Sequence, residues 1–112
     1  YTGNSSADGA FVYTGFKTAF FIAKRVDATS SNTSWVIFDN ARNPHNAMDN
    51  RLYANRSAGE GYRGDGSTPN SDIKIDFLSN GVKIRSDKDE VGAGNFIYMA
   101  FAEAPVNFSN AR

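Results

Sequence analysis

The stretch from Asp72 to Asp87 constrains the fold more than any other part of the sequence. Its centre is Asn80-Gly81, the preferred pair for a two-residue type I′ turn, because both central residues of that turn have positive φ. The stretch is therefore predicted to be a β-hairpin. This turn would fix the register, so that Phe77 faces Ile84 across the two strands.

The two faces of the predicted hairpin differ in chemistry. One face is apolar and consists of Ile73, Ile75, Phe77, Val82 and Ile84. The other consists of Asp72, Lys74, Asp76, Lys83, Arg85 and Asp87, with Leu78 beside the turn. The register predicts two opposite-charge pairs across the strands, Asp76 with Arg85 and Lys74 with Asp87. The chain is thus expected to build a sheet with one buried face and one face in water.

The remaining strands are predicted from short apolar runs between turn residues: Ala10–Thr14, Thr18–Val26, Trp35–Asp39, Arg51–Asn55 and Asn95–Glu103. The strand from Thr18 is apolar on both sides and is expected to be buried on both, and Trp35 is expected in the core. Residues 1–9 read as a polar lead-in, and residues 57–71 as a long loop. No segment longer than about ten residues has a helical period. The prediction is an all-β fold, a single antiparallel β-sandwich of jelly-roll type with six to eight short strands, spanning residues 1–112.

Composition excludes several classes of protein. The 112 residues suit one domain, and the 12 basic and 12 acidic residues cancel, so the charge excess typical of a nucleic-acid binder is missing. No apolar run approaches the ~20 residues of a membrane helix. There are no cysteines, which excludes disulfides and thiolate chemistry. The chain does not begin with Met, so we expect a processed protein or part of a longer one.

Residue chemistry gives little support for catalysis. His45 is the single histidine, and it stands in a polar loop without a nucleophile motif beside it. Carboxylates for glycoside hydrolysis could come from Asp72, Asp76, Glu90 or Glu103, but those on the hairpin have basic neighbours. We therefore predict no catalytic residue and no cofactor. Asp39 and Asp49 leave a calcium site open, although Asp39 is better explained by an ion pair with Arg42 or Arg51.

Candidate ligand-binding residues lie in two polar loops. Tyr62 stands between glycine and arginine in the long loop, where an exposed aromatic ring with polar neighbours suits a sugar. Arg63-Gly64-Asp65 matches the tripeptide of integrin ligands, a match so short that we interpret it as a turn. The predicted ligand-binding set is Tyr62, Arg63, Asp65, Asn43 and His45.

Several segments in order resemble one family. They include Asp8–Phe16, Phe21–Arg25, Trp35–Pro44, Ile75–Arg85 and Tyr98–Glu103. Together they resemble a domain of unknown function found at or near the C-termini of long bacteriophage virion proteins, usually described as tail fibre, tail tip or other surface appendages. The resemblance covers nearly the whole chain, and its motifs are strand and turn residues, so it identifies a scaffold and supplies no catalytic motif.

The resemblance implies a place on the virion surface and two alternative functions. The first is a non-enzymatic domain of a tail fibre or similar appendage that attaches through its loops to a host surface structure, with a glycan as the expected ligand. The second is a structural module, for capsid decoration or fibre capping, that contacts only other virion proteins; an extended apolar surface would favour it. A depolymerase fragment is a third, weaker hypothesis. Fibre proteins are commonly homotrimers, so the resemblance also predicts a trimer, with neither nucleic acid nor membrane as a partner.

Overall fold

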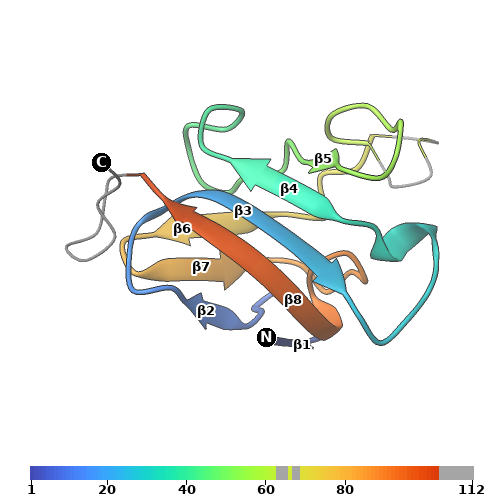
Figure 1. The fold of residues 1–112 in the computed structure, drawn as a ribbon, viewed down its shortest axis with the longest axis horizontal. Coiled ribbons are helices and arrows are strands. Elements are labelled where there is room, and N and C mark those ends of the chain that lie inside the picture. The colour runs from blue at the N-terminus through green and yellow to red at the C-terminus, as the bar shows by residue number, and fades with distance from the viewer. Residues whose placement is uncertain (63–65, 67–68, 104–112) are drawn as a thin grey trace.

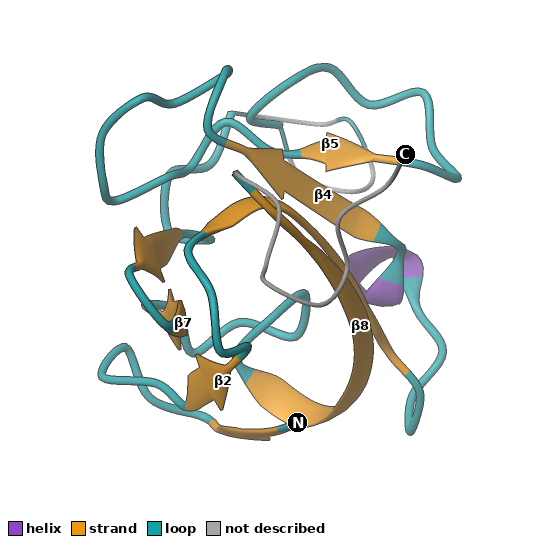
Figure 2. Cartoon of the chain, turned by 60° about the vertical axis from the view of Figure 1, so that its left-hand side comes forward, coloured by secondary structure: helices purple, strands orange, loops and turns teal. Residues whose placement is uncertain are grey.

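The computed structural model describes residues 1–62, 66 and 69–103, and within these ranges the chain forms eight strands in two antiparallel sheets. The larger sheet has the order β1 (Thr2–Asn4), β8 (Ala93–Ala102), β3 (Thr18–Arg25), β4 (Val36–Asp39), β5 (Leu52–Tyr53). The smaller has the order β2 (Phe11–Tyr13), β7 (Gly81–Ile84), β6 (Ile75–Leu78). Figure 1 shows the large sheet crossing the small one, and Figure 2 shows their two layers. The predicted all-β sandwich is confirmed.

A single apolar core fills the space between the two sheets. The central strand β3 contributes Phe21 and Ala23, both fully buried, and β7 contributes Val82 and Ile84 from the opposite layer. Alternate residues of a strand point to opposite faces, so each strand gives every second side chain to this core. The apolar face predicted for the hairpin is confirmed, because all five of its members are buried.

The register predicted for the hairpin is wrong, although its faces are right. Phe77 lies opposite Val82 instead of Ile84, so Ser79 and Asn80 form the turn and Gly81 is the first residue of β7. Asn80 does not have positive φ. The register differs from the predicted one by two residues, which leaves every side chain on its predicted face. The predicted type I′ turn is therefore not formed.

The position of the turn is explained by the neighbouring strand β2. The Asn80 carbonyl accepts hydrogen bonds from the main-chain nitrogens of Thr14 and Gly15, each at 3.1 Å. A Cβ on Gly81 would meet the carbonyl oxygen of Val12 and lie 2.7 Å from the ring of Phe11. Gly81 is thus required because β2 approaches it closely, a contact that lies far outside the hairpin itself.

One of the two predicted charge pairs forms. Asp76 accepts from Arg85 Nε at 2.7 Å, now as diagonal neighbours on the paired strands. Asp87 pairs instead with Lys88, at 3.0 Å. Asp39 accepts from Arg42 Nε at 2.8 Å, one of the two partners that the sequence allowed it.

Two further expectations about strands need correction. The lead-in is not only polar coil, because Thr2–Asn4 pairs with Ala93–Asn95 as β1. Trp35 is not in the core: it precedes β4 and is only partly buried. Phe20 and Ile22 are also partly exposed, so β3 is buried on one face alone. A strand that is apolar on both sides is expected to be covered on both, but the described residues leave one face of this sheet open.

An ion-pair group joins the start of β8 to the end of β3. Arg25 donates to Asp27 at 2.6 Å and to Asp89 at 2.8 Å, and Asp27 also accepts from the main-chain nitrogen of Asn95 at 3.1 Å. The hydrogen bond from Arg25 lowers the pKa of Asp27 below its ordinary value. The native fold therefore favours the ionised carboxylate.

This pKa shift predicts a loss of stability in acid. A carboxylate whose pKa is lowered by folding stabilises the fold above its unfolded pKa, about 3.9 for Asp, and this contribution is lost as the pH falls further. We expect the free energy of unfolding to decline below about pH 4, and to decline less in Asp27→Asn. Urea titrations at several pH values measure this, with the exposed Asp72→Asn as control for the lost charge. An equally steep decline in Asp27→Asn would contradict the assignment.

Candidate functional site

The predicted ligand-binding residues that the structure describes lie in two loops, which an ion pair between Arg42 and Glu60 joins at 3.6 Å. Tyr62 is partly exposed at 38%, and its main-chain oxygen accepts from Arg51 Nη2 at 2.8 Å. Asn43 is half-buried, and its Oδ1 accepts from the main-chain nitrogens of Asp49 (3.2 Å) and Asn50 (2.7 Å). Asn43 thus stabilises its own loop through these hydrogen bonds. His45 is exposed in that loop.

Two of the predicted residues, Arg63 and Asp65, lie outside the described residues. Within the described part of the chain, no hydrogen bond or ring contact joins Tyr62 to Asn43 or His45. Nor does that part contain a group of three or more His, Cys, Asp or Glu side chains able to hold a metal ion. No described helix is both long and apolar enough to cross a membrane.

A buried arginine organises the two polar loops, and sequence reasoning missed it. Arg51 is fully buried and donates four hydrogen bonds: Nε to Tyr53 Oη at 2.9 Å, Nη1 to the carbonyls of Asp49 and Asn70 at 3.1 and 2.7 Å, and Nη2 to that of Tyr62. Its guanidinium also lies 5.8 Å from the centre of the Tyr53 ring. A guanidinium can satisfy several carbonyls at once because its donors form a fixed planar fork. Arg51 therefore has a structural role between the loops, and it does not pair with Asp39.

A polar hollow lies beside the first of these loops, with a volume of about 310 Å³. Its lining includes Lys17, Asn40, Asn46 and Glu103. Lys17 and Glu103 pair with each other at 3.1 Å, and both side chains are about half exposed. The hollow has no exposed aromatic ring among its lining residues, so it lacks the flat apolar platform that sugar binding commonly uses.

The most distinctive surface is the outer face of the large sheet, the side turned away from the core. We call it the outer apolar face; it consists of Phe20, Ile22, Trp35, Ile37, Leu52, Ala54, Ile97, Met99 and Phe101. Register explains the grouping, since Ile22 lies between Met99 on β8 and Ile37 on β4, and Ile37 lies opposite Leu52 on β5. Residues directly opposite one another point to the same side of a sheet. Four adjacent strands therefore contribute to one surface, on which Lys24 lies opposite Ile97 and Asp39 opposite Phe20.

This face is exposed along β8. Ile97, Met99 and Phe101 are 50%, 57% and 52% exposed, whereas the alternating Phe96 on the same strand is 5% exposed. Phe20 and Phe101 contact each other edge to face, with ring centres 5.7 Å apart. Large apolar side chains gathered in this way on a solvated sheet are a mark of an interaction surface.

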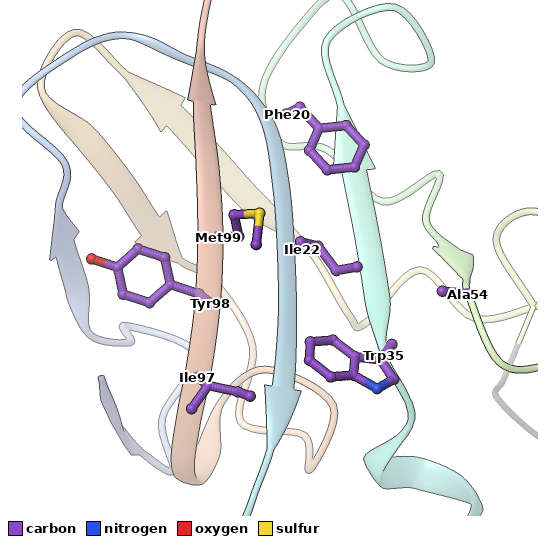
Figure 3. Close-up of a pocket in the computed structure, with 7 residues that line it drawn as sticks. All are labelled: Phe20, Ile22, Trp35, Ala54, Ile97, Tyr98 and Met99. Carbon is purple, nitrogen blue, oxygen red and sulfur yellow. The ribbon is translucent and has the colours of Figure 1, made fainter. Parts of the chain in front are cut away.

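A shallow hollow of about 530 Å³ lies on the outer apolar face. Figure 3 shows Ile22, Trp35 and Met99 around it, with Phe20, Ala54 and Ile97 at its sides and Tyr98 pointing away across β8. Tyr98 instead stacks on Phe21, with ring centres 5.5 Å apart. The lining is almost entirely apolar, so the hollow suits an apolar side chain and offers no group for acid, base or nucleophile chemistry.

The signal for this face was present in the sequence. Ile97, Met99 and Phe101 alternate along one strand, and Phe20 and Ile22 alternate along another, so both strands are apolar on two sides. Such a pattern indicates either a covered strand or an exposed apolar face. With no helix-forming segment in the sequence to cover the second side, the exposed alternative could have been favoured.

Comparison with known proteins gives one match. A family model described as "Domain of unknown function (DUF7483)" matches residues 1–105. No curated protein matches the chain. No solved structure matches it either.

Proposed function

Because the chain belongs to the DUF7483 family of domains of unknown function, we propose its function from its geometry: a non-enzymatic assembly module that binds another protein through the outer apolar face. One observation carries the proposal, the apolar surface over β8, β3, β4 and β5. Its three β8 side chains are each at least half exposed. Burial of such side chains is worth ~1.5–3 kcal/mol each, so a few of them supply much of the free energy of an interface.

The chemistry of the face selects the kind of partner. A shallow apolar hollow with Trp35 beside it accepts an aliphatic or aromatic side chain from a complementary protein surface, and aromatic residues of this kind often dominate binding energy. We further propose, from the resemblance to phage appendage domains, that this partner is another virion protein and that the domain is displayed on a virion. The outer apolar face supports the structural alternative among the two functions that the resemblance implies.

Host attachment through a glycan remains a second proposal. Its support is the partly exposed ring of Tyr62, which follows Gly61 in a loop, at a position where Gly61 has φ of 77°. The two proposals use different parts of the surface, so single substitutions can separate them.

The test compares Trp35→Ala with Tyr62→Ala. The purified domain is immobilised and offered the separated structural proteins of the particle that carries it, and in parallel a glycan array. We expect wild type and Tyr62→Ala to bind one structural protein equally, and Trp35→Ala to bind it about tenfold more weakly or worse, since truncating an interface tryptophan commonly costs more than 1 kcal/mol. Ile22→Lys should abolish this binding.

Circular dichroism should show that these variants keep the native fold, since Trp35 and Ile22 lie outside the core. Glycan binding that is lost in Tyr62→Ala and unchanged in Trp35→Ala would support attachment and contradict the assembly proposal. Protein binding that is unaffected by Ile22→Lys would also contradict it.

A further inference from the structure

Strand β8 has a long stretch of unpaired backbone on the side away from β3, beyond the short edge strand β1. In the large sheet β1 lies next to β8, but it covers only Ala93–Asn95, and Tyr1 extends this pairing to Phe96. The main-chain nitrogen and oxygen of Phe96 exchange hydrogen bonds with those of Tyr1, at 2.8 and 2.9 Å. Figure 1 shows β3 along the whole of β8 and β1 only at its start. From Ile97 onward, no described residue pairs with this edge.

The backbone groups on the open side can be identified. In an antiparallel strand, alternate residues direct N–H and C=O to the same side. Phe96 faces β1, and Asn95 faces the other way because its carbonyl accepts from Val26 at 2.9 Å. Tyr98, Ala100 and Ala102 therefore direct their N–H and C=O groups to the open side.

The other sheet edges in the described part of the chain are short or covered. β5 has two residues and β2 has three. Beside β6, Met48 exchanges main-chain hydrogen bonds with Ile75 at 2.7 and 3.0 Å, and the side-chain amide of Asn46 bonds both the nitrogen and the oxygen of Phe77 at 2.9 Å. The stretch from Ile97 to Ala102 also contains no charged residue and no proline, the residues that commonly protect an edge.

We propose that β8 pairs with β8 of a second copy of this chain, antiparallel about a two-fold axis at Ala100. The open stretch runs from Ile97 to Glu103, and Ala100 is its centre, so this register uses the full stretch without displacing Tyr1. The pairs Tyr98–Ala102, Ala100–Ala100 and Ala102–Tyr98 would each exchange two main-chain hydrogen bonds. Strand addition of this kind is a recurrent mode of recognition.

The side chains are self-complementary in this register. On the inner side, the large Tyr98 lies opposite the small Ala102. On the outer side, Met99 of each copy lies opposite Phe101 of the other copy, and a thioether beside an aromatic ring is a favourable contact. Ile97 lies opposite the aliphatic stem of Glu103. A surface that pairs with itself about a two-fold axis makes a closed dimer. This proposal does not depend on the outer apolar face being a docking site, since it rests on the unpaired backbone of β8, although the two surfaces share Ile97, Met99 and Phe101.

Cysteine pairs test the register, because the chain has no cysteine of its own. Met99 and Phe101 of the two copies would be a non-hydrogen-bonded pair with Cα atoms about 4.5 Å apart, within the range of a disulfide. Ile97→Cys serves as control, since Ile97, Met99 and Phe101 have similar exposure in the single chain. A mixture of Met99→Cys and Phe101→Cys should form a mixed disulfide on mild oxidation. A mixture of Ile97→Cys and Met99→Cys should not, because those positions would lie roughly 14 Å apart along the strands.

Light scattering over a dilution series gives an independent measurement. One chain has a mass of 12.2 kDa, and we expect the wild type to reach twice this mass. The double variant Met99→Lys/Phe101→Lys should remain a monomer, because the introduced lysines of the two copies would lie directly opposite each other. Mixing it with Met99→Glu/Phe101→Glu should restore the dimer. A wild-type monomer at every concentration, a trimer as expected from the family resemblance, or cross-linking strongest in the mixture of Ile97→Cys and Phe101→Cys would overturn the proposal. Trp35→Ala should leave the dimer intact, which separates this test from that of the assembly function.

Discussion

Replacement of Arg51 by methionine is expected to lower the free energy of unfolding by about 3 kcal/mol, since each buried hydrogen-bond acceptor left unsatisfied costs about 1–3 kcal/mol. The side chain is fully buried and donates four hydrogen bonds. Methionine fills part of the volume but has no donor. The carbonyls of Asn70 and Tyr62 would then lose their part-buried hydrogen bonds from Arg51.

Urea denaturation of Arg51→Met and Arg51→Lys measures this effect. Lysine keeps the charge but has a single nitrogen, which cannot reach the directions of the guanidinium fork, so Arg51→Lys is expected to recover only a minor part of the loss. The control is Arg42→Met, which removes an arginine that forms partly exposed ion pairs with Asp39 and Glu60, and is expected to cost at most about 1 kcal/mol. Equal destabilisation of the two methionine variants would contradict the role assigned to Arg51.

Replacement of Gly81 by alanine is expected to destabilise the fold by about 3 kcal/mol, the upper end of the cost of overpacking. The new methyl group would meet the carbonyl oxygen of Val12, and backbone on a paired strand has little freedom to move away. To make room for this methyl group, β2 would have to move away from β7 in the small sheet. The control is Gly59→Ala, whose Cβ would contact only the flexible side chain of Tyr62, at 3.3 Å.

A second substitution at the same position separates two explanations for the glycine. If Gly81 were needed for positive φ in a type I′ turn, asparagine would replace it well, since asparagine tolerates that conformation. If close approach of β2 is the reason, Gly81→Asn is worse than Gly81→Ala because its side chain is larger. Thermal unfolding of the two variants gives the order of destabilisation. If Gly81→Asn destabilised the fold less than Gly81→Ala, this would contradict the close approach of β2 as the reason and support the predicted type I′ turn.

The hairpin illustrates how far sequence reasoning reaches here. Alternation predicted the burial of its apolar side chains correctly, because the face of a strand residue depends only on its parity along the chain, but Asp76 on the opposite face is buried as well, at 8% exposed. The register depends also on β2, which is more than sixty residues earlier in the sequence. Local turn preference therefore predicted a turn one residue away from the one that the third strand favours.

The candidate site was harder to predict from the sequence, for a similar reason. Trp35 and Ile22 are apolar residues in or beside strands, and their sequence pattern does not tell whether a second layer covers them. Arg51 is adjacent to a strand and looks like an ordinary surface arginine until the loops around Asn70 and Tyr62 are folded over it. Both cases are decided by tertiary contacts between distant segments, which a single sequence does not display.

The amide of Asn46 beside β6 limits how many copies of this domain can join through their sheets. By bonding both main-chain groups of Phe77 it occupies positions that an added strand would need. If β8 pairs as proposed, a single partner occupies the long open edge of the described residues, while the β6 edge of the small sheet stays covered and its β2 edge is only three residues long. Crowding of many copies, such as repeated display on one particle would produce, should then give discrete pairs and not filaments, because linear polymerisation needs two open edges on each subunit.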